Sequence, residues 1–208
     1  MTRFHLVRHA LVEESARLVL YGTMDVPLCP ETLAAQSGQY AALAERLPRD
    51  AAWYVTPLRR TASTAEAIHA AGYPAVQPGV EPDLAEQHLG EWQGLAHAAL
   101  PPLLSRPAHT FWPLAGDERP PGGESMQDVI ERVGPVLERL AKAHPGEELV
   151  VVCHGGVIRA AVAHAMGISA DAALHLSVQN LSVSVLERHP RAWRVVCVNE
   201  VPGYDGVR

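Results

Sequence analysis

The sequence is poor in cysteine, has no excess of positive charge and contains no long apolar run. Its three cysteines are an odd number without the spacing of metal ligands, so we expect reduced thiols and no metal site. The formal net charge of -6 argues against an extended nucleic-acid surface, so any anion-binding site must be local. No apolar stretch is long enough to span a membrane, and the N-terminus lacks the layout of a signal peptide. We therefore expect a cytoplasmic protein without nucleic-acid or membrane partners.

The composition is that of an ordinary globular protein, with 48% hydrophobic and 19% charged residues. A chain of 208 residues can bury a sizeable core, and we expect one domain over residues 1–208. Apolar runs predict strands at residues 3–8, 51–55, 149–153, 174–186 and 193–199, with a weaker strand near 75–77. Helical spacing predicts helices at residues 30–47, 58–71, 124–143 and 155–166. This alternation predicts an α/β fold, in which helices cover the faces of a parallel sheet.

Two features interrupt the alternation. Gly134-Pro135 is expected to kink or split the helix at 124–143. Residues 95–122 are rich in proline and have little helical period, so we interpret them as a partly helical, lid-like insertion over the ligand crevice. A linker between two domains is the alternative, although nothing after it resembles a second complete domain. The apolar side chains of this insertion have two possible roles: they contact an apolar leaving group of the substrate, or they only form the core of the insertion. These side chains are Leu103, Leu104, Phe111 and Trp112.

Two predicted strands stop at a histidine. His9 follows Leu6-Val7-Arg8, and His154 follows Val151-Val152-Cys153. Ligands of open α/β sheets bind outside the carboxyl ends of the strands, so both histidines are expected to face one crevice. Either histidine alone could be a polar residue satisfied at a strand end. Together with Arg8 and with Arg60, which lies at the start of a predicted helix, they predict a small cationic pocket.

Such a pocket suits the transfer of a phosphoryl group. The planar guanidinium groups of Arg8 and Arg60 can each bond two phosphate oxygens, and the helix that begins at Gly155 directs its amides toward the same crevice. A neutral imidazole can attack phosphorus, and a positioned acid, for which Glu86 is the candidate, can protonate the leaving alkoxide. Arg59 is better interpreted as part of a solvated surface pair. These residues imply neither a metal nor another cofactor.

These motifs resemble those of the histidine phosphatase superfamily, which is phosphoglycerate-mutase-like. The segments that carry the resemblance follow the family order and are Leu6–Ala10, Thr56–Ala65, Leu84–Glu86, Pro121–Ser125 and Val152–Arg159. The resemblance implies a three-layer α/β/α sandwich on a mostly parallel sheet. It also implies a phosphoryl acceptor at His9, a stabilising role for His154 and a proton donor at Glu86. The candidate ligands of the substrate phosphate are Arg8, Arg60, Ser15 and Gly155.

The branch of the superfamily is indicated by the loop around the proton donor. Where the mutase branch typically has an arginine and a tyrosine, this chain has Gln87 and Leu89. The length of the chain and the loop Tyr21–Leu28 are similar to the branch that contains α-ribazole phosphatase. We therefore expect a monomer or homodimer that hydrolyses small phosphate monoesters through a phosphohistidine, without a metal.

Two alternatives stay open at this point. A phosphotransferase of the phosphoglycerate-mutase type would use the same pocket. A phosphate-binding pseudoenzyme is the other, because the chain departs from the family pattern at Ala10, Val12 and Ser15, where glycine, threonine and asparagine are common.

A different nucleophile is also conceivable, since Cys153 and Arg159 match the Cys-x5-Arg pattern of cysteine-dependent phosphatases. We favour the histidine mechanism. A cysteine that closes an apolar strand is more simply a small buried residue, and the cysteine hypothesis leaves His9 and Glu86 without a role.

Overall fold

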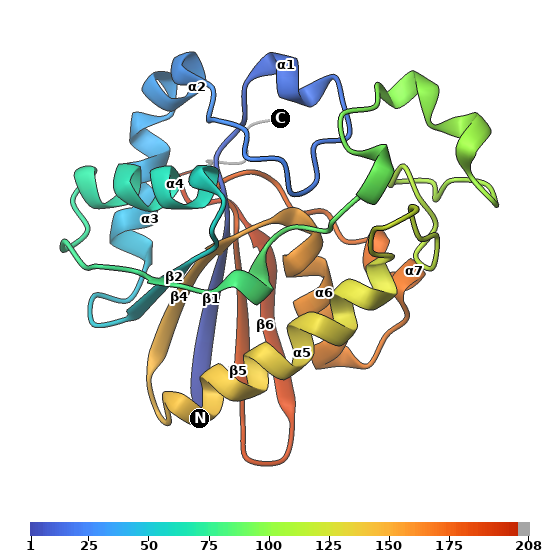
Figure 1. Ribbon diagram of the computed structural model, residues 1–208. Helices are drawn as coiled ribbons and strands as arrows, with labels where there is room; N and C mark the ends of the chain where they lie inside the picture. The colour runs from blue at the N-terminus through green and yellow to red at the C-terminus, as the bar shows by residue number, and fades with distance from the viewer. Residues whose placement is uncertain (204–208) are drawn as a thin grey trace.

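The computed structural model describes residues 1–203 and is built on a six-stranded sheet (Figure 1). The strands are β1 (Thr2–Arg8), β2 (Ala52–Val55), β3 (Gly79–Val80), β4 (Glu148–Cys153), β5 (Val183–Arg188) and β6 (Trp193–Glu200). Their order in the sheet is β3-β2-β4-β1-β5-β6. The first four strands are parallel, whereas β5 runs antiparallel to β1 and β6 runs antiparallel to β5. The prediction of a mostly parallel sheet is confirmed.

Helices cover both faces of this sheet (Figure 1). They are α1 (Glu14–Arg17), α2 (Pro30–Ala35), α3 (Ser37–Arg46), α4 (Arg59–Ala70), α5 (Met126–Ala143), α6 (Gly155–Met166) and α7 (Ala170–Leu174). The helix predicted at 30–47 is divided at Gln36 into α2 and α3. One face carries α5 and α6 and the other carries α3 and α4, so the three-layer α/β/α sandwich is confirmed.

Two cores hold the layers together, because successive strand residues point to opposite faces. Phe4 of β1 packs in the core that contains Leu137 of α5. Val7 of the same strand packs in the other core, with Ile68 of α4. The central strand β4 is buried along residues 149–153, which is typical of a parallel strand covered on both faces.

The structure differs from three predictions about element boundaries. The third parallel strand is Gly79–Val80 rather than 75–77, and it pairs with Tyr54 and Val55 of β2. The glycine suits this close pairing, since a Cβ on residue 79 would lie 2.9 Å from Cε1 of Tyr54. The first late strand begins at Val183 rather than 174. Residues 170–174 form α7, which the side chain of Ser169 caps by accepting from Ala172 N, and Leu181 has a positive φ of 59°, which interrupts any strand.

The third difference concerns α5, which is not split at Gly134-Pro135 but continues from Met126 to Ala143. A capping box between Ser125 and Asp128 fixes its start. Gly134 allows α6 to approach, since a Cβ there would lie 2.5 Å from Nδ1 of His164. The packing against α6 therefore outweighs the hydrogen bond that the proline removes.

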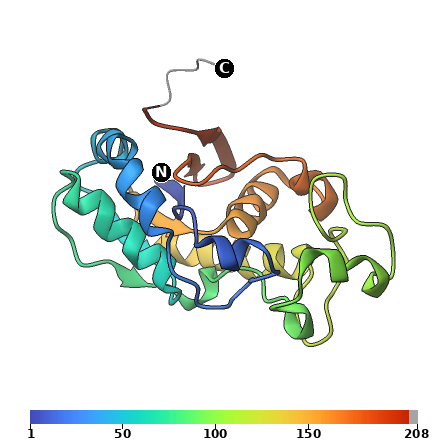
Figure 2. The same cartoon turned by 90° about the horizontal axis from the view of Figure 1, so that it is seen from above.

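The segment 95–122 contains only short 3-10 turns, at His97–Ala99 and Pro101–Leu103. It lies at the side of the molecule away from α3 and α4, next to the loop that contains α1 (Figures 1 and 2). Its apolar side chains Leu100 and Leu114 share a cluster with residues outside the segment. The prediction of a partly helical insertion agrees with these turns, and its closing as a lid stays a prediction. Over residues 1–203, every helix is either too short or too polar to cross a bilayer.

Candidate active site

The register of β1 and β4 brings the two predicted histidines together. Arg8 at the end of β1 pairs with Cys153 at the end of β4, so His9 and His154 leave the sheet side by side. Their ring centroids lie 5.2 Å apart. Both side chains are buried, with 1% and 0% of their surface exposed. The crevice expected at the carboxyl ends of the parallel strands therefore contains both imidazoles.

His9 is held in the tautomer that a nucleophile needs. A carbonyl oxygen only accepts, so the 2.7 Å bond from Nδ1 of His9 to the Ala10 oxygen places the ring proton on Nδ1. Nε2 then carries the free lone pair. The backbone on either side is also fixed, because Asn180 Nδ2 donates to the His9 oxygen over 2.7 Å and Ala10 N donates to Thr64 Oγ1 over 3.0 Å.

Arg60 and His154 form one buried unit. Arg60, in the first turn of α4, has none of its surface exposed, and its Nη1 and Nη2 donate to the carbonyl oxygens of Met24 and Gly22, each over 2.8 Å. Its Nε donates to Nδ1 of His154 over 3.3 Å. The ring proton of His154 is therefore on Nε2, which donates to Thr56 Oγ1 over 2.9 Å. Both ring nitrogens of His154 thus have protein partners.

Burial and the positive charge of this site lower the pKa of both imidazoles. Burial, followed by repulsion from Arg60 and Arg8, lowers the pKa of His9 well below its ordinary value. Burial and then Arg60 lower the pKa of His154 in the same way. Within residues 1–203, the hydrogen-bond partners of Arg8 and Arg60 are backbone oxygens and an imidazole rather than carboxylates. A buried cation without an acid partner, as Arg60 is, favours a bound anion.

Arg8 reaches from the end of β1 to the N-terminus of α6. Its Nη1 donates to the Val178 oxygen over 2.5 Å, whereas its buried Nε has no partner among the residues that the structure describes. A Cβ on Gly155 would lie 3.5 Å from Cζ of Arg8 and 3.1 Å from Nη1 of Arg159. The structure therefore brings Arg8 and Gly155 together, as the sequence predicts, and places a third arginine beside them.

Glu86 lies over the same helix N-terminus. Its Oε2 accepts from Gly156 N over 3.3 Å, and its Oε1 accepts from its neighbour Gln87 N over 3.0 Å. A Cβ on Gly156 would stand only 2.3 Å from Oε1 of Glu86, so the glycine lets the carboxylate approach the helix this closely. Burial lowers the pKa of Arg60, and the negative charge of Glu86 acts against that lowering. The predicted acid therefore lies close to the predicted phosphate ligands.

Comparison with known proteins assigns the chain to a family. The family model described as histidine phosphatase superfamily (branch 1) matches residues 4–201. The chain belongs to the histidine phosphatase superfamily. It is 33% identical over 213 residues to a metal-independent phosphoserine phosphatase of Arabidopsis thaliana, with 100% of this chain and 85% of the relative covered.

Solved structures agree with this assignment. A mycobacterial glucosyl-3-phosphoglycerate phosphatase in complex with VO3 superposes with a TM-score of 0.79 at 27% identity, over 95% of this chain and 98% of that chain. The alpha-ribazole phosphatase of Shigella flexneri shares the fold, with a TM-score of 0.77 at 19% identity over 96% and 97% of the two chains. Proteins named as phosphoglycerate mutases are also similar to this chain, so membership leaves both hydrolysis and phosphoryl transfer open.

The side chain of Cys153 points into a hydrophobic core of this member of the superfamily. Its side chain is fully buried in the core that contains Leu6 and Val157, and burial raises the pKa of its thiol far above the ordinary value. Arg159, its partner in the Cys-x5-Arg hypothesis, stacks on Trp112, with Cζ 4.5 Å from the ring centroid. The structure therefore disfavours a cysteine nucleophile.

Two other polar residues named by the sequence lie at the surface. Ser15 is exposed in α1 and is not among the residues that line the cavity around Arg8 and Glu86, so the structure does not bring it to the phosphate ligands. Arg59 forms an exposed ion pair with Asp25 over 3.0 Å, which agrees with the surface pair expected for it.

Sequence reasoning missed three residues that hydrogen-bond to His154 or to the backbone of His9 and Ala10. These are Thr56, Thr64 and Asn180. The two threonines lie within the motif segment 56–65, Thr56 directly after β2 and Thr64 on the buried face of α4, and their place in that segment could have indicated them. Asn180 is 171 residues away from His9 in a loop, and no local pattern points to it.

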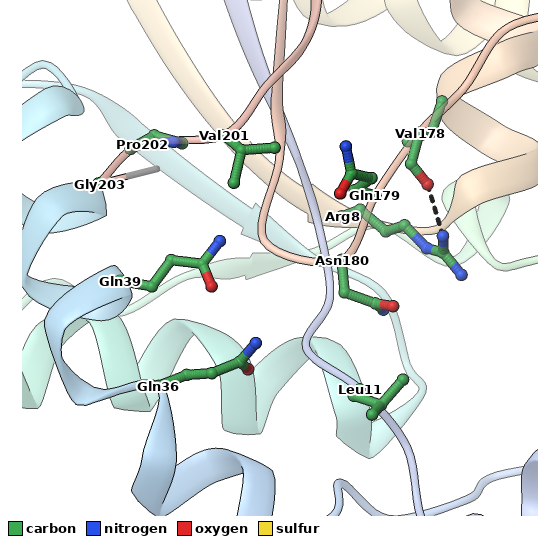
Figure 3. Close-up of a pocket in the computed structure, with 10 residues that line it drawn as sticks. All are labelled: Arg8, Leu11, Gln36, Gln39, Val178, Gln179, Asn180, Val201, Pro202 and Gly203. Atoms are coloured by element: carbon green, nitrogen blue, oxygen red, sulfur yellow. Dashed lines mark hydrogen bonds between the residues drawn. The ribbon is translucent and has the colours of Figure 1, made fainter. Parts of the chain in front are cut away.

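A second cavity, of about 480 Å³, also borders Arg8 (Figure 3). Its wall is rich in amide side chains, namely Gln36, Gln39, Gln179 and Asn180. In Figure 3 the guanidinium of Arg8 points away from these amides and toward Val178. His9, His154 and Glu86 do not line this cavity, so the larger cavity is not the candidate active site.

Proposed function

We propose that this protein is a phosphatase that hydrolyses small phosphate monoesters through a phosphohistidine at His9. The observation that carries the proposal is the tautomer of His9. Its Nδ1 donates to the Ala10 oxygen, which leaves the Nε2 lone pair free beside cations that have no acid partner. Family membership and relatives named as phosphatases support hydrolysis of a phosphate ester.

In the first step, Nε2 of His9 attacks phosphorus, and the bond between phosphorus and the ester oxygen breaks. Glu86 gives its proton to that oxygen, and the alcohol leaves. In the second step, the Glu86 carboxylate takes a proton from water, whose oxygen attacks phosphorus as the nitrogen–phosphorus bond breaks. Inorganic phosphate leaves, and Glu86 is protonated again.

The arginines supply the charge that this transfer needs. Arg8 and Arg60 bind the equatorial oxygens of the phosphoryl group, where negative charge is spread in the transition state. The amides of α6 beyond Gly155 add to this field. We propose that His154 holds the Arg60 guanidinium through Nδ1, and that no metal is required. The name of the metal-independent relative supports the last point.

A mutase must also bind a second anionic group. The cavity beside Glu86 is lined by Gln87 and Leu89, which carry no charge, so hydrolysis is favoured over transfer between phosphoglycerates. A pseudoenzyme is disfavoured because His9, Arg60 and Glu86 are all present and close together.

The test is hydrolysis of p-nitrophenyl phosphate in EDTA, with a parallel assay for interconversion of 2- and 3-phosphoglycerate. We expect turnover in EDTA and little interconversion. Activity that EDTA removes and a divalent metal restores would contradict metal independence. Phosphate binding without turnover would identify a pseudoenzyme, and efficient interconversion would identify a mutase.

A further inference from the structure

A cavity of about 230 Å³ opens directly beside Glu86, Arg8 and Gly155. A general acid must come within hydrogen-bond reach of the oxygen that it protonates. If Glu86 protonates the leaving group, the alcohol part of the substrate therefore occupies this cavity. The walls of the cavity then determine which alcohols the enzyme accepts.

Those walls are mainly apolar and aromatic. They include Leu20, Tyr21, Leu89, Trp112, Pro113 and Leu114. The cavity is larger than the roughly 150 Å³ that suffices to hold benzene in an engineered apolar site. An aromatic ring or a short alkyl chain would therefore fit against these side chains.

The walls are also fixed in place. Leu20, Leu89 and Leu114 are buried members of one apolar cluster, which Trp112 packs against. Leu20 N donates to the Leu95 oxygen over 2.8 Å, and Gly94 N donates to the Leu20 oxygen over 2.9 Å. Backbone hydrogen bonds thus connect the cavity wall at Leu20 to the start of the insertion at residues 94–95, so the cavity exists before a ligand enters.

The cavity offers little positive charge beyond Arg8, which binds the phosphoryl group. Among its lining residues only Arg8 is a permanent cation, and His97 is the one other side chain that can become positive. Arg159 is not among the lining residues: its guanidinium stacks on Trp112, its Nε donates to the Leu176 oxygen over 3.0 Å, and its Nη1 lies at the edge of the cavity, 3.1 Å from where a Cβ on Gly155 would stand. A carboxylate or second phosphate in this space would lose its water against a mainly apolar wall, and among the lining residues it would meet one permanent cation, Arg8, which also binds the transferred phosphate.

We propose that this cavity is the leaving-group subsite and that it selects phosphate monoesters of uncharged, largely apolar or aromatic alcohols. The proposal rests on the proposed hydrolysis. It predicts a preference that differs from those named for the phosphoserine and glucosyl-3-phosphoglycerate relatives, whose named substrates carry a carboxylate.

The test compares alkyl phosphates, so that the leaving groups have similar chemistry. We expect kcat/KM for 2-phenylethyl phosphate to exceed that for O-phosphoserine and 3-phosphoglycerate by about tenfold or more. Trp112→Ala should lower kcat/KM for 2-phenylethyl phosphate by about tenfold, mainly through KM, and should affect methyl phosphate little. Trp112→Phe should keep most of the preference.

Phe111→Ala is the matched control, because this neighbouring aromatic side chain is 63% exposed and does not line the cavity. Competitive inhibition by inorganic phosphate, which should be unchanged in Trp112→Ala, verifies that the phosphate ligands are still in place. Turnover with O-phosphoserine equal to or better than 2-phenylethyl phosphate would overturn the inference while leaving the phosphatase proposal intact. So would an equal loss on both alkyl substrates in Trp112→Ala. Absence of turnover with every ester would instead contradict the proposed function.

Discussion

Gly156→Ala should impair proton donation by Glu86 while leaving the fold and its stability intact. Gly156 lies in the first turn of α6, and a Cβ there would be 2.3 Å from Oε1 of Glu86, 3.3 Å from its Cδ and 3.6 Å from Cε of Met126. The only severe contact is with the end of a flexible side chain. The carboxylate must therefore move by about 1 Å to restore van der Waals distance, while the backbone can stay in place.

The size of the effect follows from this displacement. A shift of about 1 Å in a reacting group can cost about 10²-fold in rate, within the range of about 10²–10⁴-fold that general acid catalysis contributes. We expect a loss of this order in kcat for 2-phenylethyl phosphate, whose alkoxide needs the proton. Hydrolysis of p-nitrophenyl phosphate should change little, since its leaving group is stable as an anion. Thermal stability should hold or rise, because alanine is favoured over glycine in a helix by about 0.5–1 kcal/mol.

Gly38→Ala provides the control, since a Cβ at this helical position meets nothing within 4 Å. Glu86→Gln should show the same dependence on the leaving group in a stronger form. Equal losses for the two substrates in Gly156→Ala, or full activity on both with the fold retained, would refute the assignment of Glu86 as the proton donor at this place.

Two further predictions concern the nucleophile. His9→Ala should abolish turnover whereas Cys153→Ala keeps most of it, and the trapped intermediate should be labile in acid and stable in base, as a phosphoramidate is; an active His9→Ala enzyme would exclude the histidine mechanism. Because burial lowers the pKa of His9 and of His154, NMR titration should show no proton uptake by the His9 ring between about pH 7.5 and about pH 6. The unfolded chain does bind protons there, so the free energy of unfolding should decrease as the pH falls through that range; His9 titrating at its ordinary pKa would show that it is not buried as described.

The sequence was sufficient to predict the fold class and the residues at the ends of the central strands. Apolar runs and helical spacing are local patterns, and His9 and His154 directly follow two such runs. Parallel strands then bring their carboxyl ends to one edge, so the meeting of these histidines follows from the order of residues along the chain. The motif segments also located Arg8, Arg60 and Glu86, because each lies next to a predicted strand or helix boundary.

The tertiary structure alone decided which side chains meet across the chain. It placed Asn180 on the His9 oxygen, turned Arg159 toward Trp112, and left Ser15 at the surface. It also moved β3 to Gly79, where the Tyr54 ring needs space. Such contacts depend on how layers and loops pack after distant segments have come together, and hydrophobic periodicity records only which face of an element is buried, not what lies against it.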